Sequence, residues 1–455
     1  MRALAPAVAL LVVLSAVAVA VPASSVAGSD TPGDASATPV PHSTPTPRPG
    51  SAVTPPTVGP AQVETTALGE VNVLAIPPGE ATRSSLQLEA AELGSGLAFA
   101  STTAEMRVST GAAVERIESA ESTERRQQLL LREVSAVERR VGSLRASQRQ
   151  AIDAYARGDR TPRRLLYELA AIDAEARELE DRRERLQSVA ESASGFSVSS
   201  SRFGNVELEL NTLTGPVRGH AAAVLGGEVD SARFFVRTGP GSVELGVIRD
   251  GAYVREVYRE PLRTDGDGEF TLADAVNATE VAYPTIAAQR LRDDTLGSPG
   301  SDSARVTIEH ERGRLVAFVD SGSQRVFKEF QYRPIDQVTP GSPVSATRDG
   351  LELTAHRTYP GGPVRFQLNS TTDAAPVDAQ LTVGPPNGRS SVIGRTGDDG
   401  SLWTIAPAGA YQVTAIDGSS VVVLSVDPTT TPAVYGDLNR SSGNGTRTAT
   451  ATPGG

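Results

Sequence analysis

Apolar positions in the second quarter of the chain recur at intervals of four and three residues. One series comprises Leu130, Val134, Val137, Val141 and Leu144, and a second comprises Leu165, Leu169, Ile172, Ala176, Leu179 and Leu186. This heptad spacing is typical of a helix that buries one stripe against a neighbouring helix. The pattern therefore predicts two long helices that pack as an α-helical coiled-coil hairpin.

The two series are separated by the stretch "YARGDRTPRR". Gly158 follows the last periodic residue, at a position where a helix end favours a left-handed backbone that costs glycine little. Thr161 can cap the next helix, and Pro162 stands in its first turn, where no amide hydrogen is needed. We therefore interpret Gly158, Asp159, Thr161 and Pro162 as the hairpin turn. An adhesion signal at Arg157-Gly158-Asp159 is the alternative, but a Gly-Asp turn needs no receptor to explain it.

The remaining patterns predict two further domains. A single strand in "TALGEVNVLAIPPGEA" precedes the helices, so residues 63–195 form a strand plus helical hairpin domain. In residues 196–340, strands such as "SARFFVRT" and "SVELGVIRD" flank a helix in "FTLADAVNATEVAYPTIAAQRLRDD", which predicts an α+β domain. Residues 345–428 contain about seven short strands between Gly, Asp and Pro turns, as in an all-β immunoglobulin or fibronectin III-like sandwich.

Both ends of the chain have a different character. Met1 and Arg2 precede the apolar run "ALAPAVALLVVLSAVAVAVPA", and small residues follow it. This order predicts a signal peptide over residues 1–27 that is cleaved between Ala27 and Gly28. An uncleaved membrane anchor is the alternative, because the run is nearly long enough to span a bilayer. Residues 28–62 are rich in Pro, Thr and Ser, and residues 429–455 in Thr, Ser and Gly, so we expect a disordered stalk and tail.

Composition excludes several classes of function. The absence of cysteine removes disulfides, thiolate nucleophiles and iron–sulfur clusters. The net charge of -11 argues against a nucleic acid partner, since such binding rests on basic patches. Lys328 is the only lysine. An acidic, lysine-poor surface suits a halophilic protein kept soluble in concentrated salt, although a GC-rich genome would also raise the arginine content.

The sequence contains no recognisable catalytic or metal-binding motif. The four histidines, His42, His220, His310 and His356, lack metal-ligand spacing. The segment "DGDGEFTLADAV" begins like a calcium loop but departs from its required glycine and glutamate. We therefore expect no catalytic, cofactor-binding or metal-binding residues and no cofactor. Candidate N-glycosylation sites are Asn277, Asn369, Asn439 and Asn444.

The stretches "GPVRGH", "GRLVAFVDSGSQRVFKEFQ" and "GRTGDDGSLWTIAP" show a family resemblance. In them the chain resembles exported multidomain proteins of halophilic archaea of unknown function. In that group an N-terminal helical domain precedes an uncharacterised α+β domain and a fibronectin type III-like domain. The resemblance extends over about residues 65–428 and implies architecture and location, but no functional residues.

These features favour a non-catalytic exported protein, extracellular or at the cell surface, that acts as a structural or interaction module with a protein partner. A regulator or inhibitor of another exported enzyme is one alternative. An envelope hydrolase with an unrecognised site is another. We expect contact with the membrane only if the signal segment is uncleaved. Self-association through the coiled coil is left open.

Overall fold

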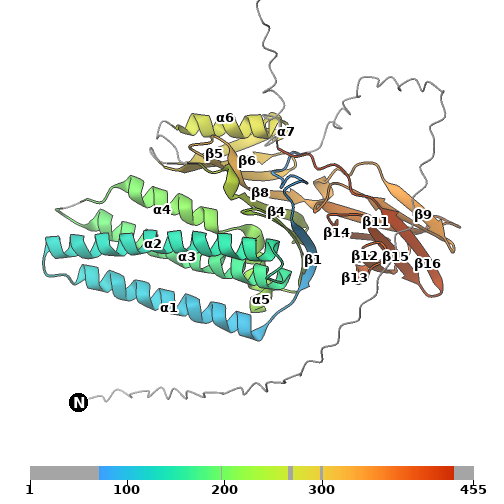
Figure 1. The fold of residues 1–455 in the computed structure, drawn as a ribbon, viewed down its shortest axis with the longest axis horizontal. Helices are drawn as coiled ribbons and strands as arrows, with labels where there is room; N and C mark the ends of the chain where they lie inside the picture. The colour runs from blue at the N-terminus through green and yellow to red at the C-terminus, as the bar shows by residue number, and fades with distance from the viewer. Residues whose placement is uncertain (1–70, 196, 265–269, 298–300, 435–455) are drawn as a thin grey trace, which may run out of the picture. The chain divides into compact units, whose positions relative to one another are not determined.

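The computed structural model describes residues 71–195, 197–264, 270–297 and 301–434. All of them lie within one compact unit of the chain, residues 64–455. After one strand comes a helical region, a sheet-rich region follows, and a β region ends the described chain (Figure 1). The predicted signal peptide, its cleavage site and the stalk lie outside the described residues.

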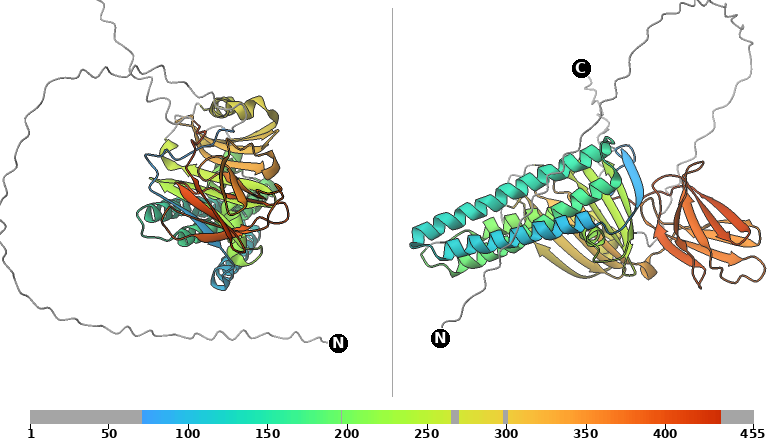
Figure 2. Two further views of the ribbon diagram at one scale, coloured as in Figure 1. Left: turned by 90° about the vertical axis from the view of Figure 1, so that its right-hand side faces the viewer. Right: turned by 90° about the horizontal axis from the view of Figure 1, so that it is seen from below.

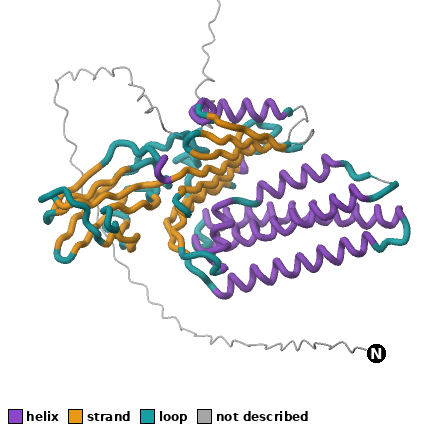
Figure 3. The backbone as a smooth tube through the Cα atoms, turned by 180° about the vertical axis from the view of Figure 1, so that it is seen from behind, coloured by secondary structure: helices purple, strands orange, loops and turns teal. Residues whose placement is uncertain are grey.

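The helical region follows a first strand, β1 (Arg83–Glu89). It consists of α1 (Leu93–Glu118), α2 (Thr123–Ala156), α3 (Pro162–Ser192), α4 (Ser200–Leu213) and α5 (Pro216–Gly226). Figure 3 separates these helices from the strands by colour. Side-chain caps begin the two longest helices: Ser122 accepts from the amide of Arg125 at 3.2 Å, and Thr161 from that of Arg164 at 3.2 Å.

A separate coiled-coil hairpin is not confirmed. The apolar stripes of α2 and α3 face each other, but they share one core with Ile117 of α1 and with Phe203 and Leu210 of α4. The long helices run side by side in the view from below (Figure 2). A heptad pattern shows that a stripe is buried but not how many helices cover it, so four helices here share the seam expected for two.

The sheet-rich region is built on one antiparallel sheet of eight strands in the order β1-β2-β3-β4-β8-β7-β6-β5. Its strands after β1 are β2 (Ala232–Gly239), β3 (Ser242–Arg249), β4 (Ala252–Arg259), β5 (Arg290–Leu296), β6 (Ser303–His310), β7 (Gly313–Asp320) and β8 (Val326–Pro334). Two helices, α6 (Leu272–Ala282) and α7 (Pro284–Ala288), and two short 3-10 turns, Glu260–Leu262 and Ile335–Gln337, complete it.

Helices cover both faces of this sheet. Neighbouring residues of a strand point to opposite faces, and in β8 Lys328 reaches the end of α4 whereas Glu329 reaches Tyr283, the residue between α6 and α7. The helical region therefore packs on one face, and α6 and α7 pack on the other. The central strands β4 and β8 are consequently buried on both sides, and their charged residues are enclosed with them.

Two strands differ from the sequence-based expectations. Residues 83–89 form β1 at one edge of the sheet, although the pattern placed helix from shortly after Pro78 onward. The strand expected before Pro77 is reduced to one bridge between Val73 and Ala433. At the other edge, β5 replaces the end of the helix expected after Pro284. Few side chains of β1 and β5 are buried, so neither strand shows the apolar alternation that marks a half-buried strand.

The C-terminal β region contains eight strands in two sheets, ordered β14-β11-β10-β9 and β13-β12-β15-β16. These are β9 (Val344–Arg348), β10 (Leu351–His356), β11 (Pro363–Ser370), β12 (Gln380–Gly384), β13 (Ser391–Arg395), β14 (Ser401–Ile405), β15 (Tyr411–Asp417) and β16 (Ser420–Val426). One apolar core, including Leu353, Phe366, Leu381 and Val413, joins strands of both sheets. The strand-rich pattern thus leads to a two-sheet sandwich.

Two expected domain boundaries fall elsewhere in the structure. Helices α4 and α5 pack with the helical region, although the pattern assigned residues after 195 to the α+β domain. Residues 429–434, expected in the tail, are ordered: Val73 donates to Pro432 O at 2.9 Å and accepts from Val434 N at 2.7 Å. The two ends of the described chain therefore lie side by side. Among the described residues, no helix is both long and apolar enough to cross a membrane.

Candidate functional site

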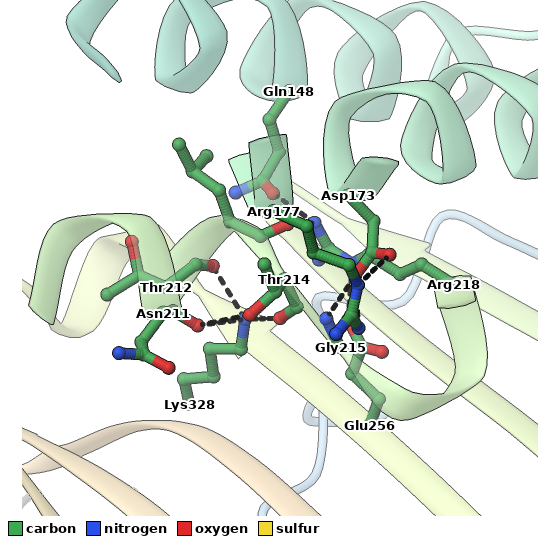
Figure 4. Close-up of polar contacts among 11 residues, drawn as sticks. Gln148, Asp173, Arg177, Asn211, Thr212, Thr214, Gly215, Arg218, Glu256 and Lys328 are labelled. Atoms are coloured by element: carbon green, nitrogen blue, oxygen red, sulfur yellow. Dashed lines mark hydrogen bonds and ion pairs between the residues drawn. The ribbon is translucent and has the colours of Figure 1, made fainter. Parts of the chain in front are cut away.

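Charged side chains gather where the helical region meets the central strands of the sheet. We call this group the helix-side cluster, and it consists of Gln148 (α2), Asp173 and Arg177 (α3), Arg218 (α5), Glu256 (β4) and Lys328 (β8). Figure 4 shows the helix residues converging on the two strand residues. Because the members come from five elements, the cluster joins the helices to the sheet.

Lys328 holds the end of α4. Its ammonium is fully buried and donates to the carbonyl oxygens of Thr212 at 2.6 Å, Thr214 at 2.5 Å and Asn211 at 3.3 Å. The last carbonyls of a helix lack partners within the helix and carry partial negative charge, so a cation there is favourable. Burial lowers the pKa of Lys328, and the nearby Arg218 guanidinium lowers it further. The only lysine of the chain is thus a helix cap.

Arg218 and Glu256 form an ion pair in which both side chains are fully buried. Arg218 also donates to Gln148 Oε1 at 2.5 Å and to Leu213 O at 3.0 Å. Removal of two charges from water is costly, and a buried pair persists only when further hydrogen bonds accompany it. Here those bonds come from α2 and from the end of α4, so the pair fixes both helices over β4.

Asp173 fixes the break between α4 and α5. Its carboxylate accepts from the amide of Gly215 at 2.7 Å and from Arg177 at 2.8 and 3.1 Å. A Cβ at Gly215 would collide with the carboxylate of Glu256. The Gly-Pro dipeptide that interrupts the helical pattern therefore allows Glu256 to approach the backbone closely.

A second group, the outer cluster, lies on the opposite face of β4 and β8 and consists of Glu244, Arg255, Tyr283 and Glu329. Arg255 contacts Glu329 at 2.5 Å and Glu244 at 3.0 Å, and Glu329 accepts from Tyr283 Oη at 2.6 Å and from the Leu74 amide at 2.6 Å. Burial alone would lower the pKa of Arg255, but the two carboxylates raise it above its usual value. Burial raises the pKa of Glu329.

The geometry of the two clusters suits a structural role, in which they hold helices and strands together, better than a role in proton transfer. A general base or nucleophile must reach a substrate within hydrogen-bond distance. Lys328, Glu256, Arg255 and Glu329 are each 0% exposed, and each contacts groups of the protein. Among the described residues, no three His, Cys, Asp or Glu side chains are grouped so as to hold a metal ion.

The residues predicted for the hairpin turn lie together between α2 and α3. Gly158 has a left-handed backbone with φ +90°, Asp159 contacts Arg157 at 3.0 Å, Thr161 caps α3 and Pro162 is its first residue. The turn is held against the sheet, because Arg83 of β1 donates to Tyr155 O at 3.3 Å and to Arg160 O at 3.1 Å.

The other predicted positions are scattered. Asn277 is exposed on α6, but the hydroxyl of Thr279 in the same sequon is buried and donates to Ala275 O at 2.8 Å. Asn369 is half-buried in β11. The other predicted positions, Ala27, Gly28, Asn439 and Asn444, lie outside the described residues.

Neither cluster was predicted from the sequence. The signal was present in "AYVREVYRE" and "VFKEFQYRP", where charged residues occupy successive positions of strands that are otherwise apolar and aromatic. A strand with one solvated face would carry charges on alternate positions only. Charges on both faces of a strand indicate either full exposure or burial in ion pairs on both sides.

Three family models match successive parts of the chain. Residues 1–230 match Domain of unknown function (DUF7096), residues 234–339 match Family of unknown function (DUF7094), and residues 342–424 match an Archaeal fibronectin-III type-like domain. The order agrees with the predicted layout, and the fibronectin III-like domain is confirmed. No curated protein and no solved structure matched the chain. Since the first model covers just over half of the residues, the chain belongs to the family described as Domain of unknown function (DUF7096).

Proposed function

We propose that this protein is a non-catalytic, exported module of the cell envelope or the medium that acts by binding or spacing protein partners. The observation that carries the proposal is that the buried charged side chains contact other parts of the protein and join its elements to one another. Lys328, Arg218 and Glu256 join α4, α5 and α2 to the sheet, and Arg255 and Glu329 join the sheet to Leu74 and Tyr283.

The family assignments support this proposal in a general way. Two domains of unknown function followed by a fibronectin III-like domain are compatible with a module that has no catalytic activity. The apolar run after Arg2 supports export, and the four sequons support glycosylation. The excess of acidic over basic residues, with a single lysine, supports adaptation to concentrated salt.

Crosslinking in intact cells tests the proposal. We expect the full chain to give a defined adduct with an envelope or secreted protein, and we expect N-terminal sequencing of the mature protein to begin at Gly28. Light scattering of the same sample in concentrated salt measures self-association. Recovery of a monomer without an adduct would contradict the interaction role, and an intact Met1 in membranes would contradict signal cleavage.

A substitution separates structural from catalytic use of the helix-side cluster. The conservative change Glu256→Gln should lower the free energy of unfolding. Neither the unmodified protein nor the variant should hydrolyse peptide or glycan substrates. If the purified protein hydrolysed peptide or glycan substrates, and Glu256→Gln abolished that activity without altering the circular dichroism spectrum, the non-catalytic proposal would fail.

A further inference from the structure

The two edges of the eight-stranded sheet differ in how they are protected. Strand β5 carries four charged residues in seven, and its register with β6 is broken near Arg290, and both features hinder the addition of another strand to an edge. Strand β1 pairs with β2 in an unbroken register, and its residues 84–88 are uncharged. Strand β1 is therefore the edge of this sheet to which a further strand can add.

A groove of about 350 Å³ runs along the free edge of β1. Ser84, Ser85 and Leu86 line one side of it, and residues 383–385 and 407–411 of the sandwich line the other. Successive residues of a strand point to opposite faces, so a groove that touches three in succession follows the edge of the strand. The other edge is paired with β2, so the groove opens onto backbone groups of β1 that the sheet does not use.

The sandwich side of the groove is joined to the sheet by hydrogen bonds. Tyr253 Oη of β4 donates to Gly361 O at 2.7 Å, and Arg233 of β2 donates to Val392 O at 2.8 Å, next to Ser391 of the lining. The volume is at the small end of the range for ligand pockets, which is about 300–1,000 Å³. A groove of this size, walled by the sandwich, suits a single extended segment better than the whole sheet of a second copy.

Two arginines at the groove have no carboxylate partner. Arg389 is exposed in the lining, which contains no acidic residue, and within the described ranges its side chain makes no ion pair or hydrogen bond. Arg233 is half-buried, and its bond to a carbonyl is not accompanied by an ion pair with any described residue. Burial lowers the pKa of Arg233, and no nearby carboxylate offsets this effect. The groove is therefore a place of uncompensated positive charge on an acidic protein.

From this combination we propose that β1 binds an extended, acidic segment of a partner protein as an additional strand. The backbone of the segment pairs with the free edge of β1, and an acidic side chain pairs with Arg389, since arginine favours bidentate contacts with carboxylates. An apolar side chain lies beside Leu88, which is 52% exposed and shares a strand face with Leu86. In this mode main-chain bonds supply affinity and alternate side chains supply specificity. The inference rests on the interaction role proposed above and adds the chemistry of the partner.

The test uses the full chain and three fluorescent peptides with blocked ends, so that no terminal carboxylate is present. All three alternate valine and threonine. The first also carries two glutamates, the second carries two lysines in their place, and the third is the glutamate peptide methylated on every central backbone nitrogen. Fluorescence anisotropy should show binding of the glutamate peptide, weakened by salt as expected for exposed charges. The other two should bind about tenfold more weakly or not at all, because one lacks the carboxylates and the other the main-chain donors.

Variants of the protein locate the binding site. Arg389→Glu should weaken binding of the glutamate peptide about tenfold or more, because like charges would then face each other. The matched control Arg348→Glu makes the same charge change at an exposed position of β9 outside the lining and should bind normally. Ala410→Trp, at an exposed position of the lining, fills the groove without changing charge and should abolish binding. Thermal melts confirm that each variant folds. Equal binding by all variants, full binding of the methylated peptide, or stronger binding of the lysine peptide would overturn the proposal.

A photo-crosslinking residue placed at Ala410 in cells separates this inference from the general function. An adduct at Ala410 that is lost in Arg389→Glu supports the groove. An adduct found only with the crosslinker at exposed Ala104 on α1 overturns the groove and leaves the interaction role standing. Dimers of the chain linked through Ala410 would overturn the acidic partner in favour of a second copy.

Discussion

Replacement of Lys328 by methionine tests the central claim about the helix-side cluster. Methionine has a similar length and no charge, so the carbonyls of Asn211, Thr212 and Thr214 lose their buried donor. Each buried acceptor left without a partner costs about 1–3 kcal/mol. The substitution also removes the cost of keeping a charged ammonium away from water, and this gain offsets part of the loss. Because three acceptors lose their donor, we expect a net loss of about 3 kcal/mol.

Two probes separate the domains during urea unfolding. Trp403, the only tryptophan, lies in β14, so its fluorescence reports on the C-terminal sandwich, whereas circular dichroism reports mainly on the helices. We expect Lys328→Met to lower the midpoint of the circular dichroism transition and to leave the fluorescence transition nearly unchanged. The control Arg292→Met removes an exposed cation and should change stability by less than about 0.5 kcal/mol. A Lys328→Met transition equal to that of the control would refute the capping role.

Three further changes have definite expected results. Arg218→Leu and Glu256→Leu should each lower the free energy of unfolding by about 3–5 kcal/mol. The double variant should lose clearly less than the sum of the two, because neither charge is then left unpaired. Additive losses in a double-mutant cycle would contradict this. Burial and the nearby Arg333 guanidinium lower the pKa of His310 to about 4. The unfolded chain takes up this proton near pH 6.5, so the free energy of unfolding should fall by about 3 kcal/mol as the pH drops from about 6.5 to about 4. His310→Gln should flatten that interval, and an unchanged pH profile would show that His310 is not responsible. Gly158→Ala should lower the free energy of unfolding by about 1–2 kcal/mol, because the backbone at this position has a positive φ. Gly142→Ala, at an exposed helical position, should raise it by about 0.5–1 kcal/mol. Equal melting temperatures for these two variants would contradict the turn assignment.

The hairpin turn was predictable because its determinants are local. A glycine with positive φ, a threonine cap and a proline at the first helical position act on their own backbone, so ten consecutive residues suffice to recognise them. The strands β2 and β3 were likewise visible, in the segments "SARFFVRT" and "SVELGVIRD". Strand β1 was not, since its pattern is polar and its pairing partner, β2, lies about 150 residues later in the chain.

The helix-side cluster shows the opposite case. Gln148, Asp173, Arg218, Glu256 and Lys328 look like ordinary surface residues in the sequence. Their burial depends on partners separated by up to 117 positions, as in the contact of Lys328 with Asn211. A local window contains no information about such partners, so neither the burial nor the pairing of these charges could be inferred.

The sequence by itself determined the order of the domains, the helical periods of α2 and α3, and the turn between them, because these depend on residues within a few positions of one another. The tertiary structure decided that four helices share one seam, that β1 joins the sheet, and that the single lysine caps α4. The physical reason is that burial of a stripe or of a charge is a property of whatever covers it. In this chain the covering groups come from distant segments, which only folding brings together.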